Sequence, residues 1–166
     1  MGKRALGIGL LIVIAVGVGA TFGLAPNTDI PSQPISFSHK IHSGEYKIPC
    51  EYCHVYARRA AVAGIPSVQR CMGCHKITGA DKPEIQKLQQ LWNEKKPIQW
   101  VKVTGMPDIV FFEHWPHVRS GIECQTCHGA VEAMAETVQA RKLSMGDCLA
   151  CHREKKASLD CLICHR

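Results

Sequence analysis

The sequence predicts a mainly α-helical protein with little regular secondary structure and without an ordinary apolar core. Three observations support this fold class. All ten cysteines fall within five short C-x-x-C-H motifs. About 140 residues follow an N-terminal apolar stretch, which leaves about 28 residues for each motif, too few to enclose an apolar core apiece. Aromatic residues make up only 6% of the chain. We therefore expect motifs on short helices, joined by long loops, with few strands.

The five motifs are Cys50–His54, Cys71–His75, Cys124–His128, Cys148–His152 and Cys161–His165. C-x-x-C-H is the attachment signature of c-type haem. Two thiols bond to the porphyrin vinyl groups, and the adjoining histidine becomes the first axial ligand of the iron. The predicted attachment sites are Cys50, Cys53, Cys71, Cys74, Cys124, Cys127, Cys148, Cys151, Cys161 and Cys164. A single motif could be a zinc or redox C-x-x-C. Five motifs with no cysteine left over predict five covalent haem c groups, with zinc knuckles or disulfides as the alternatives.

The N-terminal stretch over residues 5–25 is uncharged, mostly apolar and long enough to cross a bilayer as a helix. Lys3 and Arg4 precede it, which predicts a cytoplasmic N-terminus and an exported remainder. It could be a cleaved signal peptide, with small residues at 18–20, or a retained transmembrane anchor. Its length favours an anchor over residues 1–25, in the inner (cytoplasmic) membrane, with the haem domain on the periplasmic side. Three prolines predict an extended linker over residues 26–34.

An internal duplication organises the rest of the chain. FSHKIH at 37–42 and FEHWPH at 112–117 share the pattern F-x-H-x-x-H. Each stands about ten residues before a C-x-x-C-H, and a second motif follows each. This predicts a dihaem module at 35–80 and a trihaem module at 108–166, joined by a helix and loop at 81–107.

Two ordinary helices are expected outside the motifs. In the connecting segment, Asp81 is the predicted N-cap, Pro83 lies in the first turn, and Glu84 completes a capping-box pattern. The apolar stripe of this helix is Ile85, Leu88, Leu91 and Trp92. A second helical stretch is expected over residues 130–142, after the third motif.

The predicted axial ligands follow from a count of histidines. Five of the nine belong to the motifs, as the proximal ligands His54, His75, His128, His152 and His165. The other four all lie in the duplicated elements, and we expect them to be sixth ligands: His39, His42, His114 and His117. The expected pairs are His39 with His54, His42 with His75, His114 with His128, and His117 with His152.

The iron on His165 is then left without a histidine partner. Methionine is the usual alternative, and it raises the potential of a haem. The candidates are Met72, Met106, Met134 and Met145. We favour Met145, because it precedes Gly146 in an expected turn just before Cys148. An open, ligand-binding iron is the alternative.

The charge of the chain does not indicate nucleic acid. The polypeptide carries a formal charge of +6. Ten propionates and five ferric porphyrin cores would bring the oxidised holoprotein to about +1. No basic run is long enough for a polybasic tail. Since bis-histidine irons offer substrate no open position, the chain is predicted to carry electrons and not to catalyse a reaction by itself.

Four stretches carry a family resemblance: FSHKIHSGEYKIPCEYCH (37–54), AGIPSVQRCMGCHK (63–76), GIECQTCHGAVEAM (121–134) and MGDCLACHR (145–153). They resemble class III-like multihaem cytochromes c in general. More closely, with one N-terminal anchor, they resemble the pentahaem cytochrome c subunit of bacterial alternative complex III, a quinol:electron-acceptor oxidoreductase. That family commonly has an aromatic residue where Asp147 stands, which weakens the analogy around Met145.

The resemblance implies an electron-transfer subunit in a respiratory or photosynthetic chain. Its implied partners are an iron–sulfur subunit, polytopic quinol-binding membrane subunits, and a monohaem cytochrome c or another soluble electron acceptor. The alternatives are a free-standing membrane-anchored quinol dehydrogenase, a multihaem reductase of a small molecule, and a periplasmic carrier without a fixed partner. The paired F-x-H-x-x-H elements argue against the first, and the lack of a C-x-x-C-K motif argues against the second.

Overall fold

The computed structural model describes residues 30–165, which contain helices and loops but no strand. In chain order the elements are η1 (Lys40–Glu45), α2 (Cys50–Cys53), α3 (Val68–His75), α4 (Pro83–Asn93), α5 (His114–Arg119), α6 (Cys124–His128), η2 (Val131–Ala133), α7 (Met145–Glu154) and α8 (Cys161–Cys164). The predicted anchor at 1–25 and the start of the linker at 26–34 lie outside the described residues. Between residues 30 and 165, no helix has the length and apolar character needed to cross a membrane.

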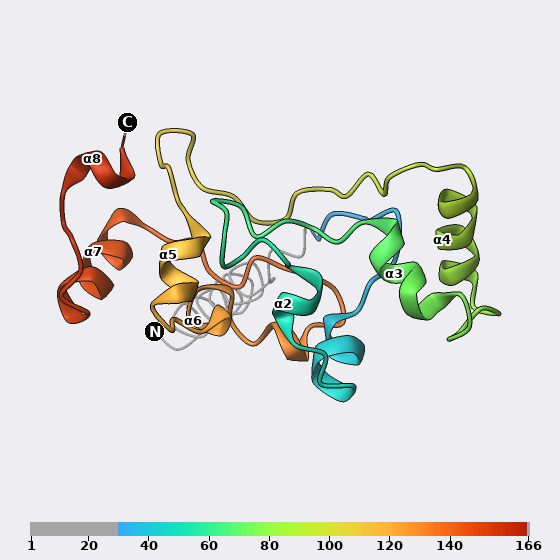
Figure 1. Ribbon diagram of the computed structural model, residues 1–166. Coiled ribbons are helices and arrows are strands. Elements are labelled where there is room, and N and C mark those ends of the chain that lie inside the picture. Colours follow the sequence, from blue (N-terminus) through green and yellow to red (C-terminus); the bar gives the residue numbers. More distant parts are fainter. Residues whose placement is uncertain (1–29, 166) are drawn as a thin grey trace, which may run out of the picture.

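The helices are spread along an extended arrangement, in an order that differs from their order in the chain (Figure 1). Helices α3 and α4 lie at one end of the view, and α7 and α8 lie at the other. Between them lie α2, α5 and α6. Long loops join these short helices, as the sequence predicts for a chain wrapped around cofactors.

The apolar core is small. Among the described residues, five hydrophobic side chains are buried: Ile35, Ala57, Val68, Met72 and Leu88. Three of them form one cluster where α3 packs on α4, with Cys71, Leu91 and Ile98 against it. This cluster holds α3, the helix that carries the second motif, against α4.

Helix α4 forms where the sequence predicts it, but it starts differently. Pro83 is its first residue, and Lys82 takes the N-cap position in place of Asp81, without a side-chain cap. Glu84 does not complete a capping box. Its carboxylate accepts a hydrogen bond from the backbone N–H of Ser36 at 2.7 Å and pairs with Lys87. The carboxylate therefore tethers the segment that precedes the first motif to α4.

The prediction of a helix over residues 130–142 is wrong, because only the short 3₁₀ helix η2 forms there. Gly129 has φ +73°, and a Cβ at this position would lie 2.7 Å from the Cβ of Ala140. The chain thus folds back tightly on itself, which a continuous helix cannot do. The backbone also bonds elsewhere, because the Met134 carbonyl accepts from the N–H of Lys40 at 2.8 Å.

Helix α7 begins with a complete capping box. Ser144 is the N-cap, its side chain accepts from the N–H of Asp147, and the Asp147 carboxylate accepts from the N–H of Ser144 at 2.8 Å. Arg141 adds an ion pair to that carboxylate at 2.9 Å. Asp147, which departs from the resembled family's pattern, therefore stabilises the start of the helix that carries the fourth motif.

Candidate haem-binding sites

Each C-x-x-C-H motif coincides with a short helix: α2, the end of α3, α6, α7 and α8. The two cysteines of each motif are three residues apart, so their thiols lie on one face of the helical turn. None of the ten cysteines forms a disulfide. Two thiols on one face can reach one porphyrin edge, which is the arrangement that covalent attachment requires.

Histidine rings meet in pairs, and the pairs match the assignment expected from the sequence. Ring centroids are 6.0 Å apart for His42 and His75, 6.3 Å for His114 and His128, and 6.0 Å for His117 and His152. An imidazole nitrogen binds a transition metal at about 2 Å, so two rings on opposite sides of one iron have centroids about 6 Å apart. The separations therefore fit a bis-histidine haem at three motifs.

His39 lies near His54, the proximal histidine with which the sequence pairs it. Burial lowers the pKa of His39, and the charge of the nearby His54 lowers it further. Burial likewise lowers the pKa of His128, with a further contribution from His114. A lowered pKa keeps the ring neutral, and neutral imidazole is the form that binds a metal.

Within residues 30–165, no group of three or more His, Cys, Asp or Glu side chains is arranged to hold a metal ion. A porphyrin supplies the equatorial ligands of its iron, so the protein needs to supply only two axial ones. The pairs of histidine rings fit this need.

Hydrogen bonds at Nδ1 would leave the other ring nitrogen, Nε2, available to bind a haem iron. Eight of the nine histidines place Nδ1 near an oxygen, and seven of those oxygens are backbone carbonyls. Among the proximal ligands, His54 bonds to the Gly64 carbonyl at 2.6 Å and His152 to the Ser158 carbonyl at 2.6 Å. A carbonyl can only accept, so Nδ1 carries the proton and Nε2 keeps its lone pair for a metal.

The two F-x-H-x-x-H elements have the same local geometry. Phe37 stacks on His42 with centroids 4.4 Å apart and meets His39 edge-on at 4.9 Å. Phe112 lies 4.6 Å from His117 and meets His114 edge-on at 5.0 Å. The phenylalanine thus packs against both histidines of its element and helps to hold their rings apart.

The spatial order of the motifs differs from their order in the sequence. Burial raises the pKa of Cys71 in the second motif, and Cys53 of the first motif raises it further. The first motif therefore lies beside the second. Burial raises the pKa of Cys124, and the neighbouring Cys50 adds to this, which places the first motif beside the third. Cys127 neighbours Cys151, and Cys148 neighbours Cys164. The spatial order is second, first, third, fourth, fifth.

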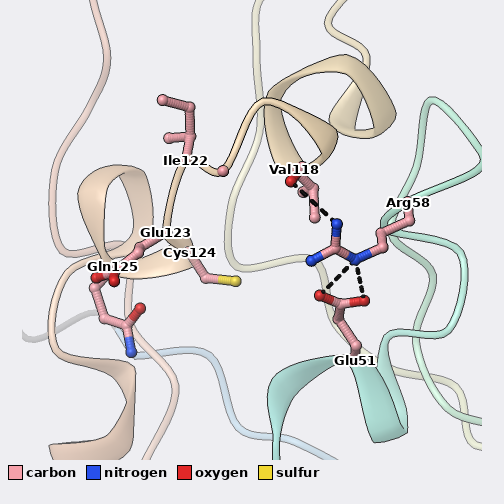
Figure 2. A pocket seen from close by; sticks show the side chains of 8 residues that line it. Glu51, Arg58, Val118, Ile122, Glu123, Cys124 and Gln125 are labelled. Carbon is pink, nitrogen blue, oxygen red and sulfur yellow. Dashed lines mark hydrogen bonds and ion pairs between the residues drawn. The ribbon is translucent and has the colours of Figure 1, made fainter.

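A cavity of about 370 Å³ lies where the first and third motifs approach each other. Glu51 and Arg58 line one side of it, and Val118, Ile122 and Cys124 line the other (Figure 2). The Arg58 Nε contacts both carboxylate oxygens of Glu51, at 2.8 and 3.0 Å. The sulfur of Cys124, a predicted attachment atom, faces this side chain pair across the cavity.

The last motif lacks an imidazole partner among the described residues, because all four spare histidines lie beside other motifs. The Nδ1 of His165 bonds to the Ile109 carbonyl at 2.9 Å, and the N–H of Phe111 donates to the Cys164 carbonyl at 2.8 Å. Met145, the predicted sixth ligand, is the first residue of α7 and is 62% exposed. Met106 is half-buried and lies three residues before Ile109. Met72 is buried in the α3–α4 cluster, and the Met134 backbone is bonded to Lys40.

Replacing Met145 with leucine tests the predicted ligand of the fifth iron. If the thioether binds this iron, its loss should lower one haem potential or make one iron high-spin, because methionine ligation raises the potential. Redox titration and EPR of the holoprotein measure both effects. Met106→Leu is the matched control and should leave all signals unchanged. If all haems stay low-spin with unchanged potentials in Met145→Leu, the assignment is wrong.

Paired histidines around short C-x-x-C-H helices, in a described part of the chain that holds no strand, are the arrangement expected of a multihaem c-type cytochrome. Residues 25–105 match the class III cytochrome c family, and residues 110–166 match cytochrome c7 and related cytochromes c. The chain is also similar to the multihaem cytochrome c subunit of a menaquinone reductase from Nitratidesulfovibrio vulgaris, with 35% identity over 97 residues. That alignment covers 58% of this chain and 45% of the relative. The cofactor type, covalently bound haem c, agrees with these families.

Proposed function

We propose that this chain is the electron-transfer subunit of a quinone-linked membrane complex. It relays electrons along five c-type haems between the iron–sulfur clusters of a partner and a periplasmic cytochrome c or similar acceptor. The observation that carries the proposal is the set of ring pairs with centroids 6.0 to 6.3 Å apart, which leaves no open position on those irons. An iron with two imidazole ligands exchanges electrons with little rearrangement and does not bind substrate.

When bound, haem c supplies a centre that takes up and gives back one electron. The chain's own residues hold and orient it. Cysteine pairs attach it, the proximal and distal histidines bind its iron, and backbone carbonyls at Nδ1 fix each imidazole. Cysteines of neighbouring motifs lie near one another from the second motif through the first, third and fourth to the fifth, and this supports a relay along the chain's proposed haems.

The proposed partners follow from similarity and not from the geometry. The resemblance to the alternative complex III subunit favours quinol oxidation, an iron–sulfur subunit and polytopic membrane subunits. The proposed location is the periplasmic face of the inner membrane, with residues 1–25 as anchor. The relative is named as a subunit of a menaquinone reductase, which favours a second candidate in which electrons run toward the quinone.

Purification of the tagged chain from its native membranes tests the proposal. We expect iron–sulfur and polytopic subunits to co-purify, and quinol to reduce the haems in the complex but not in the isolated holoprotein. Rapid reduction of the isolated chain by quinol would instead identify a free-standing quinol dehydrogenase. For the second candidate, a reduced cytochrome c should reduce the haems of the complex and drive quinone reduction.

A further inference from the structure

The four distal histidines fall into two kinds according to what holds their Nδ1 atoms. In each F-x-H-x-x-H element the second histidine is held locally. His42 bonds to the Ser38 carbonyl at 2.8 Å, and His117 bonds to the Glu113 carbonyl at 2.8 Å. Both acceptors lie four residues earlier, so each repeat orients its own second histidine through one helical turn.

The first histidine of each element is held by the other module. The Nδ1 of His39 lies 3.0 Å from the hydroxyl oxygen of Thr137, 98 residues away. The Nδ1 of His114 lies 2.7 Å from the Ala61 carbonyl, 53 residues away. Thr137 belongs to the module at 108–166, and Ala61 belongs to the module at 35–80. Each module therefore holds the first distal histidine of the other module.

Close backbone packing supports the contact at His39. The N–H of Lys40 donates to the Met134 carbonyl at 2.8 Å. Helix η1 approaches η2 so closely that a Cβ on Gly44 would overlap the Glu132 carbonyl oxygen. The segment that carries Thr137 is therefore held directly against the turn that carries His39.

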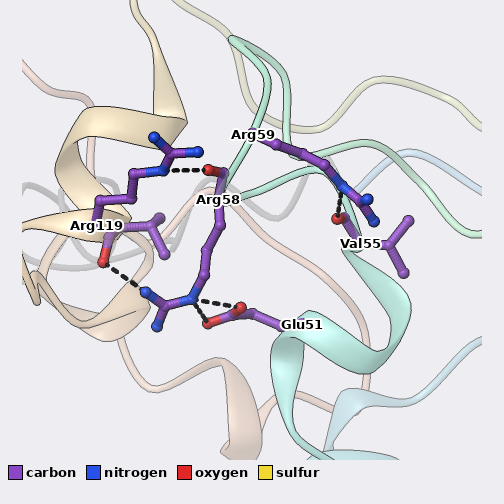
Figure 3. Close-up of polar contacts among 6 residues, drawn as sticks. Glu51, Val55, Arg58, Arg59 and Arg119 are labelled. Carbon is purple, nitrogen blue, oxygen red and sulfur yellow. Dashed lines mark hydrogen bonds and ion pairs between the residues drawn. The ribbon is translucent and has the colours of Figure 1, made fainter.

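Reciprocal backbone contacts hold the loop that carries Ala61. The N–H groups of His114 and Trp115 donate to the Ala61 and Ala60 carbonyls at 2.9 and 3.3 Å. Arg58 donates to the Val118 carbonyl at 3.4 Å, and Arg119 donates back to the Arg58 carbonyl at 2.8 Å (Figure 3). Arg59, in contrast, bonds within its own module, to the Val55 carbonyl at 3.0 Å.

We propose that Thr137 is a positioning residue for His39, acting across the two modules as the Ala61 carbonyl acts on His114. The proposal rests on the proposed ligation of the first iron by His39. If Nε2 binds the iron, Nδ1 carries a proton, and this N–H donates a hydrogen bond to the hydroxyl oxygen of Thr137. Such a bond fixes the ring plane and makes the imidazole a stronger donor, which favours the ferric state and lowers the potential.

Thr137→Val tests this role, because valine keeps the branched shape and removes the hydroxyl. In the holoprotein we expect the potential of one haem to rise and one low-spin EPR signal to shift, with the other four haems unchanged. Thr137→Ser, which restores a hydroxyl, should restore both readouts. Thr104→Val, at an exposed loop position, is the matched control and should change neither.

A second variant, His39→Ala, distinguishes iron ligation by His39 from positioning of its ring by Thr137. If it produces one high-spin haem while Thr137→Val leaves every potential and EPR signal unchanged, ligation by His39 stands and the positioning role is overturned. If His39→Ala leaves all five haems low-spin, the ligation itself is wrong. If Thr137→Ser behaves like Thr137→Val, packing and not the hydroxyl matters, which also overturns the role.

Discussion

Replacing His117 with alanine is expected to convert one of the five proposed haems from low-spin to high-spin and to open its iron to carbon monoxide. The His117 ring lies 6.0 Å from the ring of His152, and its Nδ1 is held by the Glu113 carbonyl. Alanine removes the sixth ligand and leaves the covalent attachment at Cys148 and Cys151 intact. About one fifth of the haem should therefore change spin state.

EPR of the oxidised protein and the carbon monoxide difference spectrum of the reduced protein measure this effect. Ser120→Ala is the control, since Ser120 follows α5 directly and its hydroxyl donates to the Pro116 carbonyl at 2.7 Å. It should leave the haems low-spin. A His117→Ala protein with five low-spin haems and no carbon monoxide binding would remove His117 from the ligand set.

Truncating Leu88 to alanine is expected to destabilise the protein by about 2–4 kcal/mol. Leu88 is only 3% exposed and, with Val68 and Met72, forms the apolar cluster between α3 and α4. So small a cluster has few other contacts to compensate for a cavity. Because α3 carries Cys71 and His75, the loss should loosen the haem site at the second motif first.

Chemical denaturation followed by far-UV circular dichroism measures the free energy of unfolding. Gln86→Ala is a control on the exposed face of the same helix and should change stability by about 0.5 kcal/mol or less. Equal denaturation midpoints for Leu88→Ala and Gln86→Ala would show that this cluster does not stabilise the fold.

Local patterns in the sequence predict the parts of the site that depend on local geometry. The short helices follow from the motif spacing, and α4 follows from its apolar stripe. The pairing of His42 with His75 and of His117 with His152 follows from the duplication, and the structure brings these rings together.

Contacts between distant segments could not be predicted in this way. The sequence around Gly129 does not reveal that Ala140 packs against it, so local patterns predict a helix over residues 130–142. No local sequence pattern links Thr137 to His39, which lies 98 residues earlier. The Ala61 carbonyl carries no side-chain signal at all, because every residue has one. The position of the first motif between the second and the third depends on the same long-range packing.

The contact between Thr137 and His39 also bears on the order in which the protein matures. A chain is made from its N-terminus, so the first C-x-x-C-H and its distal histidine exist long before residue 137 does. The environment of the first haem therefore becomes complete only when nearly the whole chain is present, 98 residues after His39. A truncated product that ends before η2 would lack Thr137, and with it the hydroxyl oxygen that lies 3.0 Å from the Nδ1 of His39.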